Sequence, residues 1–152
     1  MQQYNFQYCQ KLVIYSKDES SVLLCKRKDE ADFDGAFSFI GGKMENTDSG
    51  IIDGLQREKD EEVGKDFNIK VFPFFTTNIF FVKKDGSAMI LPHFYAIHTA
   101  GDVVLNEEYS EYAWVSLEDV DNFEPKINTI SDVLHKMTIL KKVIKETPFK
   151  IL

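Results

Sequence analysis

The segment from Gly41 to Gly64 constrains the fold of this 152-residue chain more than any other. Two adjacent glycines, Gly41 and Gly42, follow a short apolar segment and predict a break in it. Residues 51–63 then carry apolar side chains that favour a helix, and Gly64 is a typical helix stop. The segment therefore predicts a short apolar stretch, a glycine break, a loop and one helix.

Strand-like segments lie on both sides of this helix. Residues 84–87 have the composition of a hairpin turn, and Pro92 indicates an edge position or a bulge. Ser116, with an acid three residues later, has the pattern of a helix cap, and residues 129–145 carry apolar residues at helical spacing. The predicted strands are residues 8–15, 21–27, 68–75, 78–82, 89–98 and 113–115. This order predicts a mixed α/β fold with helices packed on a sheet.

Composition narrows the classes of partner. Lys and Arg number 18 and Asp and Glu 25, so the formal net charge is −7. A protein that binds nucleic acid needs a basic face, so we expect no nucleic-acid partner. A local basic groove is still compatible with this net charge. The hydrophobic fraction of 43%, with 13 Phe, is sufficient for a packed core.

The cellular compartment is predicted from sequence features that are absent. The two cysteines, Cys9 and Cys25, are too few for a disulfide framework, and they lack the paired spacing of a zinc site. We therefore expect both to be thiols packed in the core. The first residues have no basic segment followed by an apolar core, and no apolar run is long enough to span a bilayer. We expect a cytoplasmic protein with no membrane partner.

Three carboxylates gather on one face of the predicted helix. At about 100° per residue, Glu58, Glu61 and Glu62 fall within an arc of roughly 100° beside the apolar face. Like charges at these spacings repel, and a divalent cation such as Mg²⁺ or Mn²⁺ would relieve the repulsion. Arg57, four residues before Glu61, can brace that carboxylate by an ion pair. The alternative interpretation is a solvated acidic helix face.

The run Arg57-Glu58-x-x-Glu61-Glu62-x-Gly64 resembles the Nudix box, G-x5-E-x7-R-E-U-x-E-E-x-G-U with U a bulky apolar residue, and matches its second half without a gap. Residues 35–42 are similar to the segment that precedes the box in this family. Residues 107–115 are similar to an acidic-aromatic segment that occurs late in the family's domain. The resemblance spans the chain from the first strands to about Val120. It implies an α/β/α sandwich with a mixed central sheet, as a single domain over residues 1–152.

The chain departs from the family pattern at three places. Asp48 stands where the family has Glu, and it is one residue further from Arg57 than the pattern allows, which an extra residue in the Ser49-Gly50 loop would absorb. Lys59 and Lys65 occupy apolar positions. Lys59 either lays its methylenes on the core with its amine outside, or the helix packs less deeply there.

The resemblance implies an enzyme, a Nudix pyrophosphohydrolase that cleaves a diphosphate linkage by water attack on phosphorus, usually with Mg²⁺. The substrate would be a nucleoside triphosphate, a nucleotide sugar or a dinucleotide. The implied metal ligands are Gly41, Gly42, Glu58, Glu61, Glu62 and Glu108. The catalytic candidates are Arg57, Glu58, Glu61, Glu62 and Glu111, and the general base among the carboxylates stays open.

Substrate contacts and alternatives complete the expectations. Arg27 could contact a phosphate, and Phe80 and Tyr95 could stack on a base, although core packing explains these aromatic residues as well. The aromatic segments 72–75 and 79–81 could form a homodimer face, with core burial as the alternative. A catalytically silent nucleotide sensor of the same fold is the second functional hypothesis, and an acidic interaction domain is the third.

Overall fold

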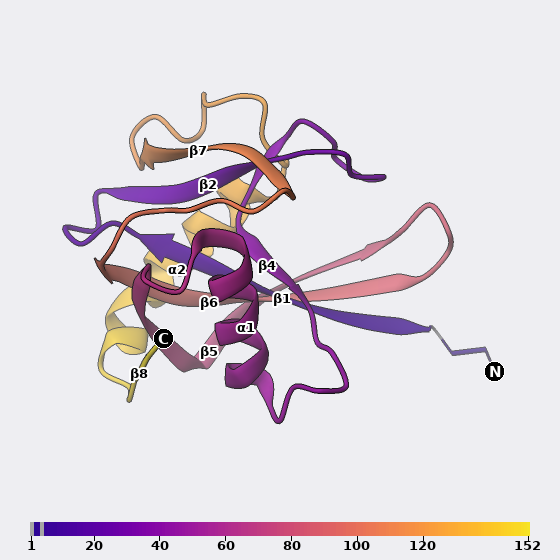
Figure 1. The fold of residues 1–152 in the computed structure, drawn as a ribbon, viewed down its shortest axis with the longest axis horizontal. Helices are drawn as coiled ribbons and strands as arrows, with labels where there is room; N and C mark the ends of the chain where they lie inside the picture. The colour runs from indigo at the N-terminus through magenta and orange to yellow at the C-terminus, as the bar shows by residue number, and fades with distance from the viewer. Residues whose placement is uncertain (1, 4) are drawn as a thin grey trace.

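The computed structural model describes residues 2–3 and 5–152, which form two helices and eight strands, and Figure 1 labels both helices and every strand except β3. Residues 21–27 and 51–63 form a strand and a helix with the predicted bounds. The strands are β1 (Phe6–Tyr15), β2 (Ser21–Arg27), β3 (Phe37–Ser38), β4 (Ile40–Lys43), β5 (Asn68–Val82), β6 (Ala88–Ala100), β7 (Tyr109–Ser116) and β8 (Lys150–Ile151), and the helices are α1 (Ile51–Val63) and α2 (Ile130–Lys145).

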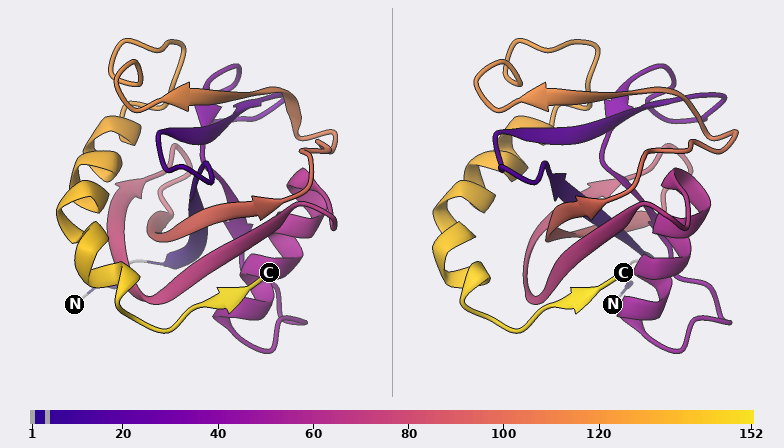
Figure 2. Two further views of the ribbon diagram at one scale, coloured as in Figure 1. Left: turned by 90° about the vertical axis from the view of Figure 1, so that its left-hand side faces the viewer. Right: turned by 60° about the vertical axis from the view of Figure 1, so that its left-hand side comes forward.

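The strands form one mixed sheet in the order β3-β2-β1-β6-β5-β8, with β4 paired to β1 and β7 paired to β2. β1 runs parallel to β6, and the other pairs are antiparallel. β1 pairs with β4 through residues 9–12 and with β2 at Tyr15, so it links two parts of the sheet. Figure 2 shows α1 and α2 on opposite sides of the strands.

Each face of the sheet carries its own apolar cluster, because neighbouring residues of a strand point to opposite faces. In β1, Val13 and Tyr15 join the cluster that contains α2 residues such as Met137. Leu12 and Ile14 join the cluster that contains Leu55 and Val63 of α1. The arrangement is the α/β/α sandwich with a mixed central sheet that the sequence predicted.

The glycine pair does not break the apolar segment, contrary to the prediction, because it lies inside β4. Gly41 is opposite Lys11 of β1, and Gly42 is opposite Gln10. A Cβ on Gly41 would lie 2.1 Å from the backbone oxygen of Gln10, and the residue has φ +137°. The glycines therefore serve a close approach of two strands rather than a turn.

Three further predictions need correction. Residues 68–75 and 78–82 belong to one strand, β5, because a register shift between Phe72 and Thr76 absorbs extra residues while pairing continues. Pro92 lies in β6, between β1 and β5, so the edge position is wrong; the pairing of β6 with β1 is instead interrupted at residues 91 and 92, between Ile90 and His93. Ser116 ends β7 and is followed by turns, so its oxygens bond the amides of Glu118 and Asp119 without starting a helix.

Cys9 and Cys25 are free and buried, which confirms the prediction of packed thiols. Within the described residues, neither helix has the length and apolar character that crossing a bilayer requires.

Candidate active site

A cavity of about 520 Å³ lies where β1, β4, α1 and the start of β7 meet. Its wall mixes five acidic and three basic side chains with the glycine pair. It is lined by Cys9, Lys11, Arg27, Glu30, Gly41, Gly42, Lys43, Met44, Glu45, Glu58, Glu62, Glu108 and Tyr109. Of the residues singled out from the sequence, Arg27, Gly41, Gly42, Glu58, Glu62 and Glu108 are therefore brought together here.

Glu62 is the most enclosed carboxylate of this cavity, with 3% of its surface exposed. The amide of Gly41 donates to Oε2 at 2.8 Å, and the hydroxyl of Tyr109 donates to Oε1 at 3.0 Å. Burial raises the pKa of Glu62 to about 8, Lys11 acts against that rise, and the charges of Glu58 and Glu108 add to it. Glu62 is thus held in one orientation by donors from two strands.

Glu58 lies one turn earlier on α1 and faces the same cavity. A Cβ on Gly42 would lie 2.5 Å from the Glu58 carboxyl carbon, so the glycine makes room for this side chain against the strand. Nη1 of Arg57 donates to Glu58 at 2.9 Å. Burial raises the pKa of Glu58 despite this neighbouring guanidinium.

Arg57 connects the helix to the loop that leads into it. Its Nε and Nη2 donate to the two carboxylate oxygens of Asp48 at 2.8 and 3.0 Å, and Nη2 also donates to the backbone oxygen of Lys43 at 3.1 Å. This pairing lowers the pKa of Asp48. Asp48 thus accepts a two-pronged hydrogen bond from Arg57 despite being shorter than the Glu of the family pattern.

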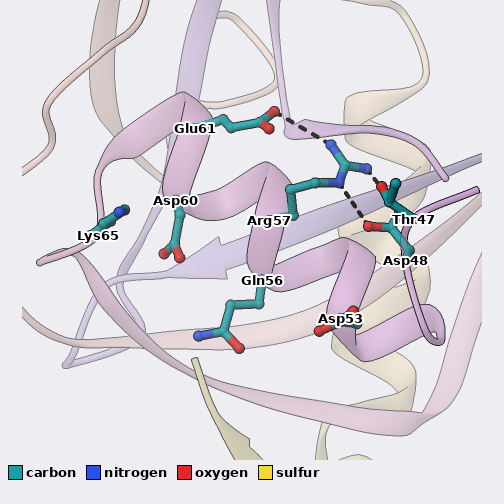
Figure 3. A pocket seen from close by; sticks show the side chains of 8 residues that line it. All are labelled: Thr47, Asp48, Asp53, Gln56, Arg57, Asp60, Glu61 and Lys65. Carbon is teal, nitrogen blue, oxygen red and sulfur yellow. Dashed lines mark hydrogen bonds and ion pairs between the residues drawn. The ribbon is translucent and has the colours of Figure 1, made fainter. Parts of the chain in front are cut away.

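Glu61 lies on the other side of Arg57, outside the cavity lining. Its Oε2 is 3.4 Å from Nη1 of Arg57, and its side chain is 53% exposed. Figure 3 shows it pointing toward Arg57 at the rim of a separate groove of about 440 Å³ on the outer side of α1. This outer groove is lined by Thr47, Asp48, Asp53, Gln56, Arg57, Asp60, Glu61 and Lys65.

Lys59 behaves differently from both expectations for it. Leu55 and Val63 are fully buried, so the helix packs deeply, and Lys59 itself is 1% exposed, so its amine does not reach bulk water. Its Nζ donates to the backbone oxygens of Gly64 at 3.3 Å and Lys65 at 3.5 Å, and it pairs with Asp60 at 2.5 Å. The ammonium therefore binds carbonyls at the helix C-terminus, where the helix dipole favours a cation.

Three other candidates from the sequence lie away from the cavity lining. Glu111 pairs with Lys26 at 3.3 Å and is largely exposed. Phe80 is 54% exposed, with its ring 6.4 Å from that of Phe6. Tyr95 is buried in the cluster on the α2 side, where its hydroxyl donates to Glu19.

Arg27 does line the cavity, where it forms an ion pair with Glu30 at 3.3 Å. Its Nε is buried, and within the described part of the chain it has no hydrogen-bond partner. A buried donor of this kind is costly unless a ligand or water satisfies it.

Two of the lining residues that the sequence did not single out act directly on Glu62. Tyr109 lies in the acidic-aromatic stretch, but its contact with Glu62 depends on how β7 is placed against α1. Lys11 directly precedes the apolar run of residues 12–15 in β1, and a lysine beside such a run is the signal that could have identified it.

The donor set of the cavity suits a hard divalent cation. Glu58, Glu62 and Glu108 supply carboxylate oxygens, the ligands that Mg²⁺ and Mn²⁺ prefer, and their mutual repulsion favours a cation among them. They do not form a ready-made cluster, since over residues 2–3 and 5–152 no three acidic, His or Cys side chains are grouped closely enough to hold an ion. Binding would therefore require these side chains to converge.

Comparisons with known proteins agree with the fold. The family model described as the NUDIX domain matches residues 10–136. The chain is 29% identical over 123 residues to the nucleoside triphosphatase NudI of Klebsiella pneumoniae, covering 71% of this chain and 82% of that protein. Among solved structures, it is similar to the MutT protein from Methanosarcina mazei, with a TM-score of 0.75, 23% identity and coverage of 93% and 99% of the two chains. A C. elegans Ap4A hydrolase in a binary complex gives a TM-score of 0.72 at 19% identity, covering 90% and 98%.

Proposed function

The chain belongs to the Nudix hydrolase family, and from this premise we propose that it hydrolyses the diphosphate linkage of a nucleoside triphosphate. The relative from Klebsiella pneumoniae, named a nucleoside triphosphatase, supports this choice over a nucleotide sugar or a dinucleotide. The observation that carries the proposal is the cavity in which Glu58 and Glu62 lie beside the cations Lys11 and Arg27. Carboxylates that could hold a metal ion and cations that could bind a phosphate thus line the same cavity.

Glu58 and Glu62 are the residues that would hold a divalent cation, and Glu108 lies in the same cavity with its carboxylate left to accept a proton. Glu61, expected from the family pattern as a further ligand, pairs with Arg57 outside this cavity and would contribute less to metal binding. Between the two glycine carbonyls, that of Gly42 suits a cation better, because the Gly41 carbonyl already accepts a hydrogen bond from Lys11 at 3.2 Å. When bound, Mg²⁺ supplies positive charge for the phosphoryl oxygens and lowers the pKa of a water molecule.

The remaining steps belong to side chains of the chain itself. Arg27 lines the cavity with an unsatisfied Nε and is the proposed phosphate contact. Glu108 is the proposed proton acceptor, because it lines the cavity and, unlike Glu58, forms no ion pair with Arg57. The positions of Glu111, Phe80 and Tyr95 outside the lining give them no part in this proposal.

The proposal is tested with a panel of nucleoside triphosphates, nucleotide sugars and dinucleotides, assayed for phosphate-containing products with Mg²⁺ and then with EDTA. We expect cleavage of at least one nucleoside triphosphate that requires the metal. Glu62→Gln should lower kcat at least about 100-fold, because it replaces a charged ligand by a neutral one of the same shape. Glu118→Gln, an exposed substitution after β7, is the matched control and should retain full activity.

Two outcomes would contradict the proposal. Cleavage that persists in EDTA would contradict the requirement for a metal, and cleavage that persists in Glu62→Gln would contradict the assignment of this cavity as the active site. Absence of product from every substrate, with thermal stabilisation by one nucleotide, would support the nucleotide sensor instead.

A further inference from the structure

Lys11 is a buried cation in the wall of the candidate active site. It lies in β1 opposite Gly41 of β4 and His93 of β6, and 8% of its surface is exposed. Its Nζ donates to the backbone oxygen of Gly41 at 3.2 Å, and its charge acts on Glu62. The residues that follow it in the strand, Leu12 and Val13, are fully buried and apolar.

A lysine in such a position costs free energy of desolvation unless its charge and donors are used. An ammonium group has three N–H donors, and the bond to Gly41 is the one hydrogen bond that Lys11 donates within the described residues. Arg27, in the wall of the same cavity, also has a buried donor without a partner there. Two cations with unsatisfied donors in one cavity indicate an anionic ligand with several acceptor oxygens.

On the basis of the proposed function, we propose that Lys11 binds a phosphate oxygen of the substrate from the strand side of the cavity. The glycine pair favours this role, because neither Gly41 nor Gly42 has a side chain to cover the ammonium from β4. Lys11 also places a positive charge among five acidic side chains, where an incoming diphosphate would otherwise be repelled. The positive charge of a bound metal ion and that of Lys11 in β1 would thus both act on the same diphosphate.

The alternative role for Lys11 is to hold Gly41 and Glu62 in place without touching the ligand. The two roles are separated by measuring two affinities by calorimetry. One is the affinity for inorganic diphosphate in the presence of Mg²⁺, and the other is the affinity for Mn²⁺ alone. Wild type, Lys11→Met and Lys11→Arg are compared, with Lys84→Met on the exposed β5–β6 turn as the control.

We expect Lys11→Met to weaken diphosphate binding about 10-fold or more, as the loss of a charge-assisted hydrogen bond does. Its affinity for Mn²⁺ alone should be equal to that of wild type or higher, because no metal ligand has been removed. Lys11→Arg should retain most of the diphosphate affinity, and Lys84→Met all of it.

Diphosphate affinity in Lys11→Met equal to that of wild type would overturn the proposal. An equal loss of diphosphate and Mn²⁺ affinity would overturn it too, since it would show a structural role. If Lys11→Met does not give a cooperative thermal transition, Lys11→Gln replaces it under the same criteria. Because the binding assay needs no turnover, Lys11-dependent diphosphate binding by a wild-type protein that cleaves nothing would contradict the proposed function and leave this inference standing.

Discussion

Glu61 and Glu62 are adjacent, carry the same carboxylate and lie in opposite environments. Glu62 is buried against β4 and β7 with a donor on each oxygen, whereas Glu61 is half-exposed beside the outer groove and touches Arg57 at 3.4 Å. Arg57 lies between the two sides: it contacts Asp48 and Glu61 (Figure 3) and also donates to Glu58. Because adjacent residues of a helix point about 100° apart, Glu62 faces the glycine pair and the cavity whereas Glu61 faces away from them.

Arg57→Ala is expected to have the largest effect of the variants that leave the cavity carboxylates in place. It releases the loop at Lys43 and Asp48. The Asp48 carboxylate, whose side chain is 3% exposed, then keeps only the backbone amide of Glu45 as a hydrogen-bond donor among the described residues. We expect kcat to fall about 100-fold and the free energy of unfolding to fall by about 1–3 kcal/mol.

Chemical denaturation and the hydrolysis assay measure these two quantities. Arg57→Lys should recover only part of the loss, because an ammonium cannot donate in parallel to both oxygens of Asp48. Full activity in Arg57→Ala would contradict the assignment of Arg57 as the connection between loop and helix.

The buried state of Glu62 predicts a dependence of stability on pH in EDTA. Its pKa is about 8 in the folded protein and near 4.5 when unfolded, so the folded state binds the proton more tightly. The free energy of unfolding should therefore decrease as pH rises from about 4.5 to about 8, by an amount on the order of a few kcal/mol.

Glu62→Gln should remove most of this decrease and leave the part that comes from the raised pKa of Glu58, whereas Glu61→Gln should leave the decrease in place. Urea denaturation at several pH values in EDTA measures both. A wild-type stability that rises through the same range, unchanged in Glu62→Gln, would show that Glu62 is not buried as described.

Tyr109→Phe removes one of the two donors to Glu62 while keeping the ring in place. We expect kcat to fall about 10-fold, because groups that orient a metal ligand contribute effects of this size. Tyr112→Phe, an exposed substitution in the same strand, is the control and should be close to wild type. Equal activity of both variants would mean that the amide of Gly41 alone orients Glu62.

Glu61→Gln should have the smallest effect, a reduction in kcat of less than about 10-fold, because its exposed ion pair with Arg57 contributes little. Steady-state kinetics at saturating Mg²⁺ measures it. A loss as large as that of Glu62→Gln would mean that the two faces of α1 act as one metal site. It would contradict the functional difference between Glu61 and Glu62.

Local signals in the sequence were sufficient for much of the fold. Gly64 ends α1 as predicted, and residues 21–27 are a strand with the predicted bounds, because turn residues delimit them. The glycine pair was misread, since its role depends on the close approach of β1, which is a tertiary contact. The same holds for the site: spacing on the helix identified Glu58 and Glu62, whereas Lys11 and Tyr109 reach them from other strands. Helical geometry alone also could not separate Glu61 from Glu62.

The most direct test of the account is the affinity for Mn²⁺, without nucleotide, of wild type, Glu62→Gln and Glu61→Gln. The account predicts that Glu62→Gln weakens Mn²⁺ binding at least about 10-fold and that Glu61→Gln changes it much less. Equal affinity in all three proteins, or a greater loss in Glu61→Gln, would contradict the claim that the cavity side of α1 is the metal-binding side.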